Sequence, residues 1–100
     1  MSDTKEKTKT LTEILEDTGI EVESENVHKL VLWNDDVNSF EWVITCLVQV
    51  LSFIPKKAEN TAWEVHLKGK SIIKSGSMEE LKPFKKIFED LGLTLSIEKD

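Results

Sequence analysis

Three consecutive polar residues, Asn34-Asp35-Asp36, lie between a short apolar run and a longer one. Asn and Asp favour turns, so this triplet considered alone predicts an ordinary turn between a strand and a helix. Its amide and carboxylate oxygens are also hydrogen-bond acceptors clustered just before a helix start, where a cation can bind. The triplet alone favours the plain turn and leaves the cation site as the alternative.

His66 is the second side chain that could take part in binding or catalysis, and it also has two interpretations. A histidine near the C-terminal end of a helix interacts favourably with the helix dipole and can simply lie on the surface. Alternatively, its imidazole is a polar group at the rim of a pocket. Considered alone, His66 favours the surface position.

The set of side chains disfavours catalysis. Asp35 and Asp36 are adjacent, so their carboxylates are expected to diverge and not to act as a pair. His28, His66 and Cys46 do not have the spacing of a zinc site, and the chain has no glycine-rich phosphate-binding loop. An enzyme that uses Asp35 and His66 as an acid–base pair is the least favoured hypothesis. No metal or cofactor is expected.

Composition predicts one folded domain with an acidic extension. The chain has 100 residues, a net charge of −6 and no arginine, which disfavours nucleic-acid binding. Residues 1–26 hold eight acidic residues and three lysines, a net charge of −5, whereas residues 27–100 are close to neutral. Residues 1–26 are therefore predicted to be a flexible extension. A short helix that forms on a partner through Leu11, Ile14 and Leu15 is the alternative for this segment.

Nothing in the sequence resembles a signal peptide or reaches transmembrane length. Cys46 is the only cysteine, so it cannot form an intrachain disulfide, and its apolar neighbours predict a buried side chain instead of a reactive thiol. Together these features predict a cytoplasmic protein without membrane contact.

The first half of the folded domain is predicted to contain a strand and two helices. Residues 27–33 have the composition of a strand. A strongly apolar helix is expected over 39–53, with Asn38 as its N-cap and Glu41 three residues later, as in a capping box. Pro55 suits the first turn of a second helix.

The second half is predicted to contain two strands and a helix. Residues 71–73 suggest a strand, and residues 77–80 carry a second capping-box pattern. Pro83 would lie beyond the first turn of a helix that begins there, so a turn is expected first, then a helix from about residue 81 or 83 to residue 91. Residues 93–97 alternate as a strand does. The predicted class is α+β, a small three-stranded sheet with helices packed on one face.

Two segments, residues 32–43 and 64–70, together resemble the ClpS family. This is the bacterial adaptor that delivers N-end-rule substrates to a Clp AAA+ unfoldase and its protease. The first segment contains the end of an apolar strand, the Asn-Asp-Asp triplet and Glu41, and the second contains Val65-His66 followed by Gly69-Lys70. The resemblance covers residues 27–76 well, and the set in this order is more specific than any one of its parts.

The resemblance implies a role for each matching position in binding the N-terminal residue of a substrate. Asn34, Asp35 and His66 match the residues that receive the α-amino group, and Asp36 belongs to the same motif. Other positions match the pocket for the first side chain, with Asn38 at its edge. The pocket positions are Asn38, Phe40, Val43, Ala62, Val65 and Leu93.

The resemblance also implies partners. They are the N-domain of a Clp AAA+ unfoldase of the ClpA or ClpC type and substrate proteins that bear N-degrons, and the chain is expected to be a monomer. Residues 1–26 match the extension that engages the unfoldase during delivery. Glu79 is the best candidate for a further contact with the unfoldase.

The implied chemistry suits a free amino terminus. An α-amino group has a pKa of about 7.7–8.0, so at neutral pH it is mostly a cation with three N–H donors. An asparagine oxygen, a carboxylate and an imidazole can accept them, and a charge-assisted hydrogen bond contributes about 1.5–3 kcal/mol. Burying a Leu or Phe side chain contributes about 1.5–3 kcal/mol more. A free terminus and a bulky first residue (Leu, Phe, Tyr or Trp) are both expected to be required.

Two positions depart from the family pattern. Phe40 stands where members commonly have a methionine, and Ala62 replaces a second bulky residue. The aromatic ring narrows one wall while the alanine opens another, so the preference among Leu, Phe, Tyr and Trp stays open.

An alternative function is a different interaction module on the related fold of the ribosomal stalk protein's C-terminal domain. Such a module would recruit factors by surface contacts and would not need Asn34, Asp35 and His66 together. Fold alone does not decide between the two functions.

Overall fold

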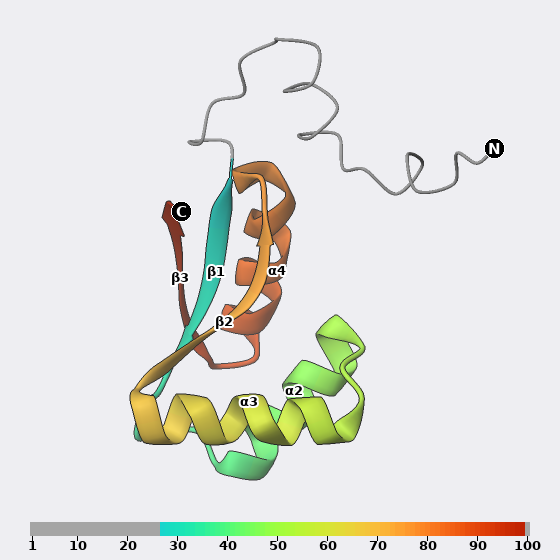
Figure 1. Ribbon diagram of the computed structural model, residues 1–100, viewed down its shortest axis with the longest axis vertical. Helices are drawn as coiled ribbons and strands as arrows, with labels where there is room; N and C mark the ends of the chain where they lie inside the picture. Colours follow the sequence, from blue (N-terminus) through green and yellow to red (C-terminus); the bar gives the residue numbers. More distant parts are fainter. Residues whose placement is uncertain (1–26, 100) are drawn as a thin grey trace, which may run out of the picture.

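The computed structural model describes residues 27–99, which form six elements (Figure 1). The predicted order of elements and the α+β class are confirmed. Residues 1–26 and residue 100 lie outside the described part, and so do the predicted extension and its docking-helix alternative. The elements are β1 (His28–Trp33), α2 (Phe40–Leu51), α3 (Pro55–Lys68), β2 (Lys70–Gly76), α4 (Met78–Asp90) and β3 (Thr94–Lys99).

The strand β1 is the centre of the sheet, which has the order β2-β1-β3 with both neighbours antiparallel to β1. Its register with β2 shifts between Leu30, which pairs with Lys74, and Val31, which pairs with Ile72. Ile73 is therefore an extra residue in β2, as in a β-bulge. The strand β2 is longer than the predicted strand over residues 71–73.

The core lies between the sheet and the helices. Figure 1 shows α4 along the strands, and α2 and α3 together at one end of the sheet. Alternate residues of β1, Leu30 and Leu32, face the core because successive side chains of a strand point to opposite faces. Cys46 is buried, as predicted, and its burial raises the pKa of the thiol. The buried cluster is Leu30, Leu32, Cys46, Leu47, Ala58, Val65, Ile73, Leu81, Phe88, Leu93 and Leu95.

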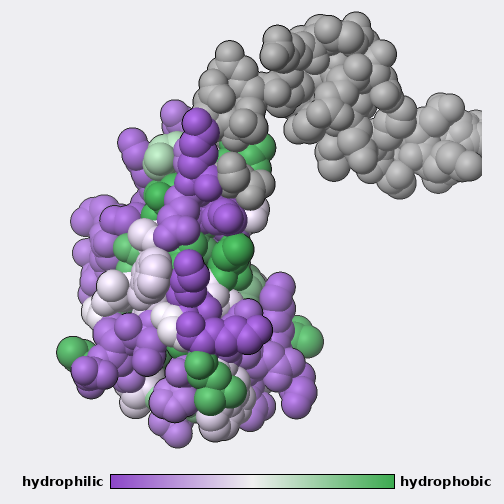
Figure 2. All heavy atoms as spheres, turned by 60° about the vertical axis from the view of Figure 1, so that its left-hand side comes forward, coloured by the Kyte–Doolittle hydropathy of each residue, from purple (hydrophilic) through white to green (hydrophobic). Residues whose placement is uncertain are grey.

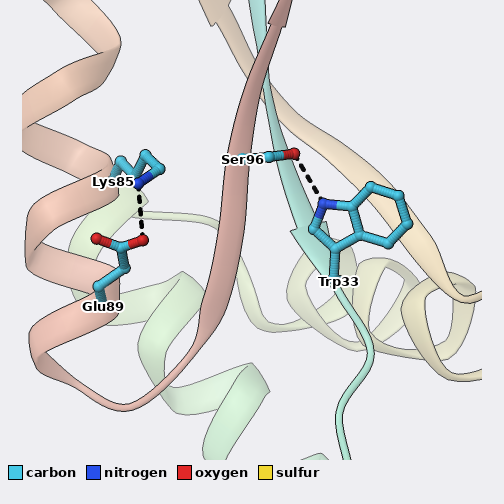
Figure 3. A network of polar contacts seen from close by, with 4 residues as sticks. All are labelled: Trp33, Lys85, Glu89 and Ser96. Atoms are coloured by element: carbon cyan, nitrogen blue, oxygen red, sulfur yellow. Dashed lines mark hydrogen bonds and ion pairs between the residues drawn. The ribbon is translucent and has the colours of Figure 1, made fainter.

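Polar contacts reinforce the outside of this fold. The Trp33 indole donates a 2.8 Å hydrogen bond to Ser96 Oγ across β1 and β3, on the side of β3 away from the Lys85–Glu89 ion pair of α4 (Figure 3). In the space-filling view of Figure 2, hydrophilic residues cover most of the coloured surface, and hydrophobic residues appear in small separate patches. The face visible there offers no large apolar surface of the kind that marks an extensive interface.

The predicted N-cap of α2 is wrong by one residue. Ser39 is the cap, and its Oγ accepts a 3.1 Å hydrogen bond from the backbone N–H of Trp42. Asn38 instead binds the loop before the helix through its side chain. The capping box predicted between Asn38 and Glu41 therefore does not form.

The break predicted near Pro83 is also wrong, because α4 continues through this residue. Proline removes one backbone donor from a helix, but the capping box of Ser77 and Glu80 forms as predicted and defines the first turn. Leu81 and Phe88 are fully buried on the inner face of the helix. Cap and core packing together offset the local cost of the proline.

Substituting Ser77 with alanine is expected to destabilise the fold. Ser77 Oγ accepts a hydrogen bond from the Glu80 N–H at 3.1 Å, and Glu80 Oε1 accepts one from the Ser77 N–H at 2.9 Å. Loss of an N-cap side chain costs about 1 kcal/mol, measurable as a lower urea midpoint. The exposed strand residue Ser75 gives the matched control, Ser75→Ala. Equal effects of the two substitutions would contradict a role for the cap.

Candidate functional site

A cavity of about 590 Å³ lies between the loop after β1, the start of α2 and the second half of α3. It brings together the Asn-Asp-Asp triplet and His66, which are far apart in the sequence. In the described part of the chain, three carboxylate residues and no lysine contribute to its lining. The lining residues are Asn34, Asp35, Asp36, Asn38, Ser39, Phe40, Glu41, Val43, Ala62, Trp63, Val65 and His66.

A backbone hydrogen bond brings the triplet close to the end of α3. The N–H of Asn34 donates to the carbonyl oxygen of Gly69 at 2.9 Å. Gly69 has a φ of 91°, a conformation that glycine adopts without steric cost, so α3 can end and β2 can begin at once. His66 lies in the last turn of α3 and is thereby held beside the triplet.

Three polar side chains of the lining have hydrogen-bond acceptors that remain free within residues 27–99. Asn34, Asp36 and His66 are exposed, and in the part of the chain that the structure describes no hydrogen bond or ion pair engages their side chains. An amide oxygen, a carboxylate and a neutral imidazole can each accept an N–H donor. Asn34, Asp36 and His66 together form the polar cradle of the cavity.

Asp35 has its acceptor capacity filled by the protein itself. Its Oδ1 accepts the backbone N–H groups of Val37 at 3.0 Å and Asn38 at 2.9 Å, and its Oδ2 accepts the Thr94 hydroxyl at 3.0 Å. The amide of Asn38 donates to both oxygens, at 3.1 and 3.0 Å. A carboxylate offers about four lone-pair sites, so these contacts occupy the acceptors of Asp35 and shape the loop. The role expected for Asp35 in receiving an α-amino group stays a prediction, and the lining residues with open acceptors are those of the polar cradle.

The same contacts set the ionisation of Asp35. Burial raises its pKa, but the backbone N–H groups of Asn38 and Val37 and the side chains of Asn38 and Thr94 together outweigh burial. The pKa of Asp35 therefore lies below its ordinary value, and the carboxylate is ionised at neutral pH. Asn38 extends the network by donating to the carbonyl oxygen of Gly92 at 2.7 Å. The loop after β1 is thus tied to the turn between α4 and β3.

The apolar wall of the cavity consists of Phe40 and Val43 from α2 and Ala62 and Val65 from α3. The family resemblance implied that these four residues form a side-chain pocket, a role that stays a prediction. Ala62 and Val65 are 3% exposed, and the other two are half-buried. Leu93 was predicted to belong to this wall but does not line the cavity. It lies behind the wall, where it borders a small void of about 10 Å³ with Val43 and Val65.

Trp63 is a lining residue to which the sequence analysis gave no role in the site. Its ring centroid lies 4.6 Å from that of Phe40 and 6.0 Å from that of His66. Helical spacing is the signal that could have revealed it, because residues three apart share one face of a helix. Trp63 and His66 have this spacing. Ser39 and Glu41 also line the cavity without having been assigned to it.

The geometry gives no support to an acid–base enzyme. The hydrogen bonds to Asp35 come from Val37, Asn38 and Thr94, and none comes from His66.

Within residues 27–99, no group of His, Cys, Asp and Glu side chains is arranged to hold a metal ion. No helix in this part of the chain is long and apolar enough to cross a membrane. Glu79 is exposed in the first turn of α4 and does not line the cavity.

Asp35→Asn is expected to reduce the acid sensitivity of the fold. Because folding lowers the pKa of Asp35, the ionised carboxylate stabilises the fold above its ordinary pKa of about 3.9. That contribution is lost as the pH falls through the lower value of the folded state. The asparagine keeps one oxygen for the N–H groups of Val37 and Asn38 but does not titrate.

Urea unfolding at about pH 6 and about pH 3 measures this effect. The difference in unfolding free energy between the wild type and Asp35→Asn should shrink at the lower pH. Asp36→Asn is the matched control, because it removes a neighbouring carboxylate that makes no hydrogen bond within residues 27–99. A difference for Asp35→Asn that is constant with pH would contradict the assigned network.

Comparison with known proteins places the chain in a family. Residues 23–94 match the family model described as ATP-dependent Clp protease adaptor protein ClpS. The ATP-dependent Clp protease adapter protein ClpS of Thermosynechococcus vestitus is 32% identical over 73 residues, which cover 69% of this chain and 74% of that protein. The protein of the same name from Synechocystis sp. is 33% identical over 72 residues, covering 68% and 70%.

A solved structure agrees with the fold. The structure of Agrobacterium tumefaciens ClpS2 bound to L-phenylalaninamide is similar to this chain with a TM-score of 0.65 and 18% sequence identity. The similarity covers 76% of this chain and 99% of that chain. Taken with the match over residues 23–94, these relatives show that the chain belongs to the ClpS family, the adaptor proteins of the ATP-dependent Clp protease.

Proposed function

We propose that this adaptor binds the free α-amino group and the bulky hydrophobic first side chain of a substrate protein, and that it delivers the substrate to a Clp AAA+ unfoldase for degradation. The polar cradle receives the amino group, and the apolar wall receives a Leu, Phe, Tyr or Trp side chain. No chemical reaction is assigned to the cavity.

The observation that carries this proposal is the composition of the cavity lining. Asp35, Asp36 and Glu41 contribute negative charge there, and no lysine within residues 27–99 lines the cavity. Such a site attracts a cation, and its open acceptors suit a group with several N–H donors. A protonated α-amino group has that charge and three donors.

The apolar wall adds the second requirement. It lies beside the polar cradle in the same cavity, so an amino group and the side chain on the adjacent carbon can be bound together. Burying a Leu or Phe side chain contributes about 1.5–3 kcal/mol. Agrobacterium tumefaciens ClpS2, which shares the fold, is described as bound to L-phenylalaninamide. That compound has both a free amino group and a large apolar side chain, which supports the proposal.

Peptides that begin with Phe, Leu, Trp or Tyr are expected to bind the full chain, and their N-acetylated forms are not. Acetylation removes the charge and two of the donors. A charge-assisted hydrogen bond of about 1.5–3 kcal/mol corresponds to about 10- to 150-fold in affinity, so acetylation should weaken binding by at least this factor. Fluorescence anisotropy with a labelled peptide measures the difference. Equal binding of free and acetylated peptides would overturn the proposal and favour a surface-contact module.

Loss of the imidazole tests the polar cradle separately. His66→Ala is expected to weaken binding of the free peptide by about 10-fold or more, with little change in unfolding free energy because His66 is exposed. Leu67→Ala, at the next position on α3 and 73% exposed, is the matched control and should bind normally. If both variants bind as the wild type does, His66 has no part in the site.

Delivery requires a second surface. We propose that the partner is the N-domain of an unfoldase of the ClpA or ClpC type, and that residues 1–26, which lie outside the described part of the chain, engage the unfoldase during delivery. We further propose that the folded domain contacts the unfoldase through Glu79, and that the adaptor acts as a cytoplasmic monomer. Glu79 does not line the cavity, so the two surfaces can be occupied together.

Reversing the charge at Glu79 is expected to slow delivery without weakening substrate binding. Glu79→Lys should raise the adaptor concentration needed for half-maximal degradation of a Phe-starting reporter severalfold, because a reversed charge at an interface repels its former partner. Anisotropy with the Phe-starting peptide should remain unchanged. Glu59→Lys on α3, another exposed carboxylate outside the cavity, is the control. Equal effects of the two reversals would contradict a specific contact at Glu79.

A further inference from the structure

We infer that Trp63 is a specificity-determining residue that makes this cavity prefer aromatic first residues over leucine. The inference rests on the proposed function, because it concerns the same cavity. It adds the residue that selects among the bulky side chains, a choice that Phe40 and Ala62 left open at the level of sequence.

Trp63 is the middle member of a row of three rings. Phe40, the first residue of α2, has its ring centroid 4.6 Å from Trp63 at an interplanar angle of 54°. His66 also lies beside Trp63, with ring centroids 6.0 Å apart and an interplanar angle of 73°. The row therefore joins the apolar wall to the polar cradle, and all three rings line the cavity.

The row gives the wall a defined aromatic surface. Ring pairs at these distances and tilts are favourable arrangements, so Phe40 loses a contact if it turns away from Trp63. The backbone of Phe40 is held as well, since it follows directly after the Ser39 cap. A ring of a bound peptide can pack against this surface with the same geometry, whereas a leucine side chain gains only the burial of its area.

The hydrogen bonds of the three tryptophans single out Trp63. The indole of Trp33 donates to Ser96 Oγ at 2.8 Å, and that of Trp42 donates to the Leu91 carbonyl oxygen at 3.0 Å. Both indoles thereby stabilise the fold. The indole N–H of Trp63 has no acceptor within residues 27–99, and the residue is 45% exposed. Trp63 thus belongs to the lining of the cavity, and the buried core does not include it.

The experiment compares peptides that differ only in the first residue. Unlabelled peptides beginning with Phe, Trp or Leu compete with a labelled Phe-starting peptide for the full chain, measured by fluorescence anisotropy. The variants are Trp63→Leu, Phe40→Leu and their combination. Trp42→Leu is the matched control, since it removes an indole that lies outside the cavity lining.

An aromatic pair changes affinity by about 2- to 12-fold, and the wild type is expected to prefer Phe over Leu by a factor in this range. Trp63→Leu should bring the ratio close to one while the dependence on a free amino terminus persists. The combined variant should lower the Phe-to-Leu affinity ratio little further than either single substitution does, because the two rings act together. Trp42→Leu should retain the wild-type ratio.

Two results would overturn the inference. If peptides bind through a free amino terminus but the Phe-to-Leu ratio is the same in the wild type and Trp63→Leu, the proposed function stands and Trp63 does not select. If the wild type binds the Leu-starting peptide more tightly than the Phe-starting one, the aromatic row does not select for aromatic first residues. Failure of every peptide to bind would overturn the proposed function and this inference with it.

Discussion

The hydrogen-bonded carboxylate of Asp35 is the constraint on which the site depends. It accepts the N–H groups of the following loop and the hydroxyl of Thr94, while Asn38 carries the network to Gly92. One ionised side chain thus joins the end of β1, the start of α2 and the start of β3. Without it, the N–H groups of Val37 and Asn38 would lose their acceptor, and the loop that carries Asn34 and Asp36 would be held at Asn34 by its hydrogen bond to Gly69.

The site contains two kinds of surface, the polar cradle and the apolar wall, and both adjoin the loop that Asp35 holds. The polar cradle uses side chains whose acceptors are not occupied by any group within residues 27–99. An open acceptor is costly only if it is buried, and all three side chains are exposed. The apolar wall uses residues that already belong to the packing of α2 against α3, such as Val65. Because Val65 and His66 are neighbours in the chain, the packing of α3 also determines where the imidazole lies.

Much of this arrangement could be predicted from the sequence. Apolar periodicity predicted the order of the elements, and the resemblance to the ClpS family implied that His66 lies with Asn34 and Asp36. Local chemistry was ambiguous where neighbours compete: Asn38 and Ser39 are both good caps, and only the contacts with Asp35 and Gly92 decide between them. Pro83 was misjudged because the packing of α4 against the core depends on tertiary contacts. The role of Trp63 likewise follows from a contact between two helices.

Nuclear magnetic resonance of the ¹⁵N-labelled full chain with phenylalaninamide tests the central claim most directly, because each backbone amide and each indole reports separately. Binding in the cavity predicts shifts at residues 34–43 and 62–66 and at the Trp63 indole, with the Trp33 indole unchanged, since Trp33 does not line the cavity. N-acetyl-phenylalaninamide should leave the same signals unmoved. Shifts centred on the sheet around Trp33, or identical shifts with both compounds, would contradict recognition of a free amino terminus in this cavity.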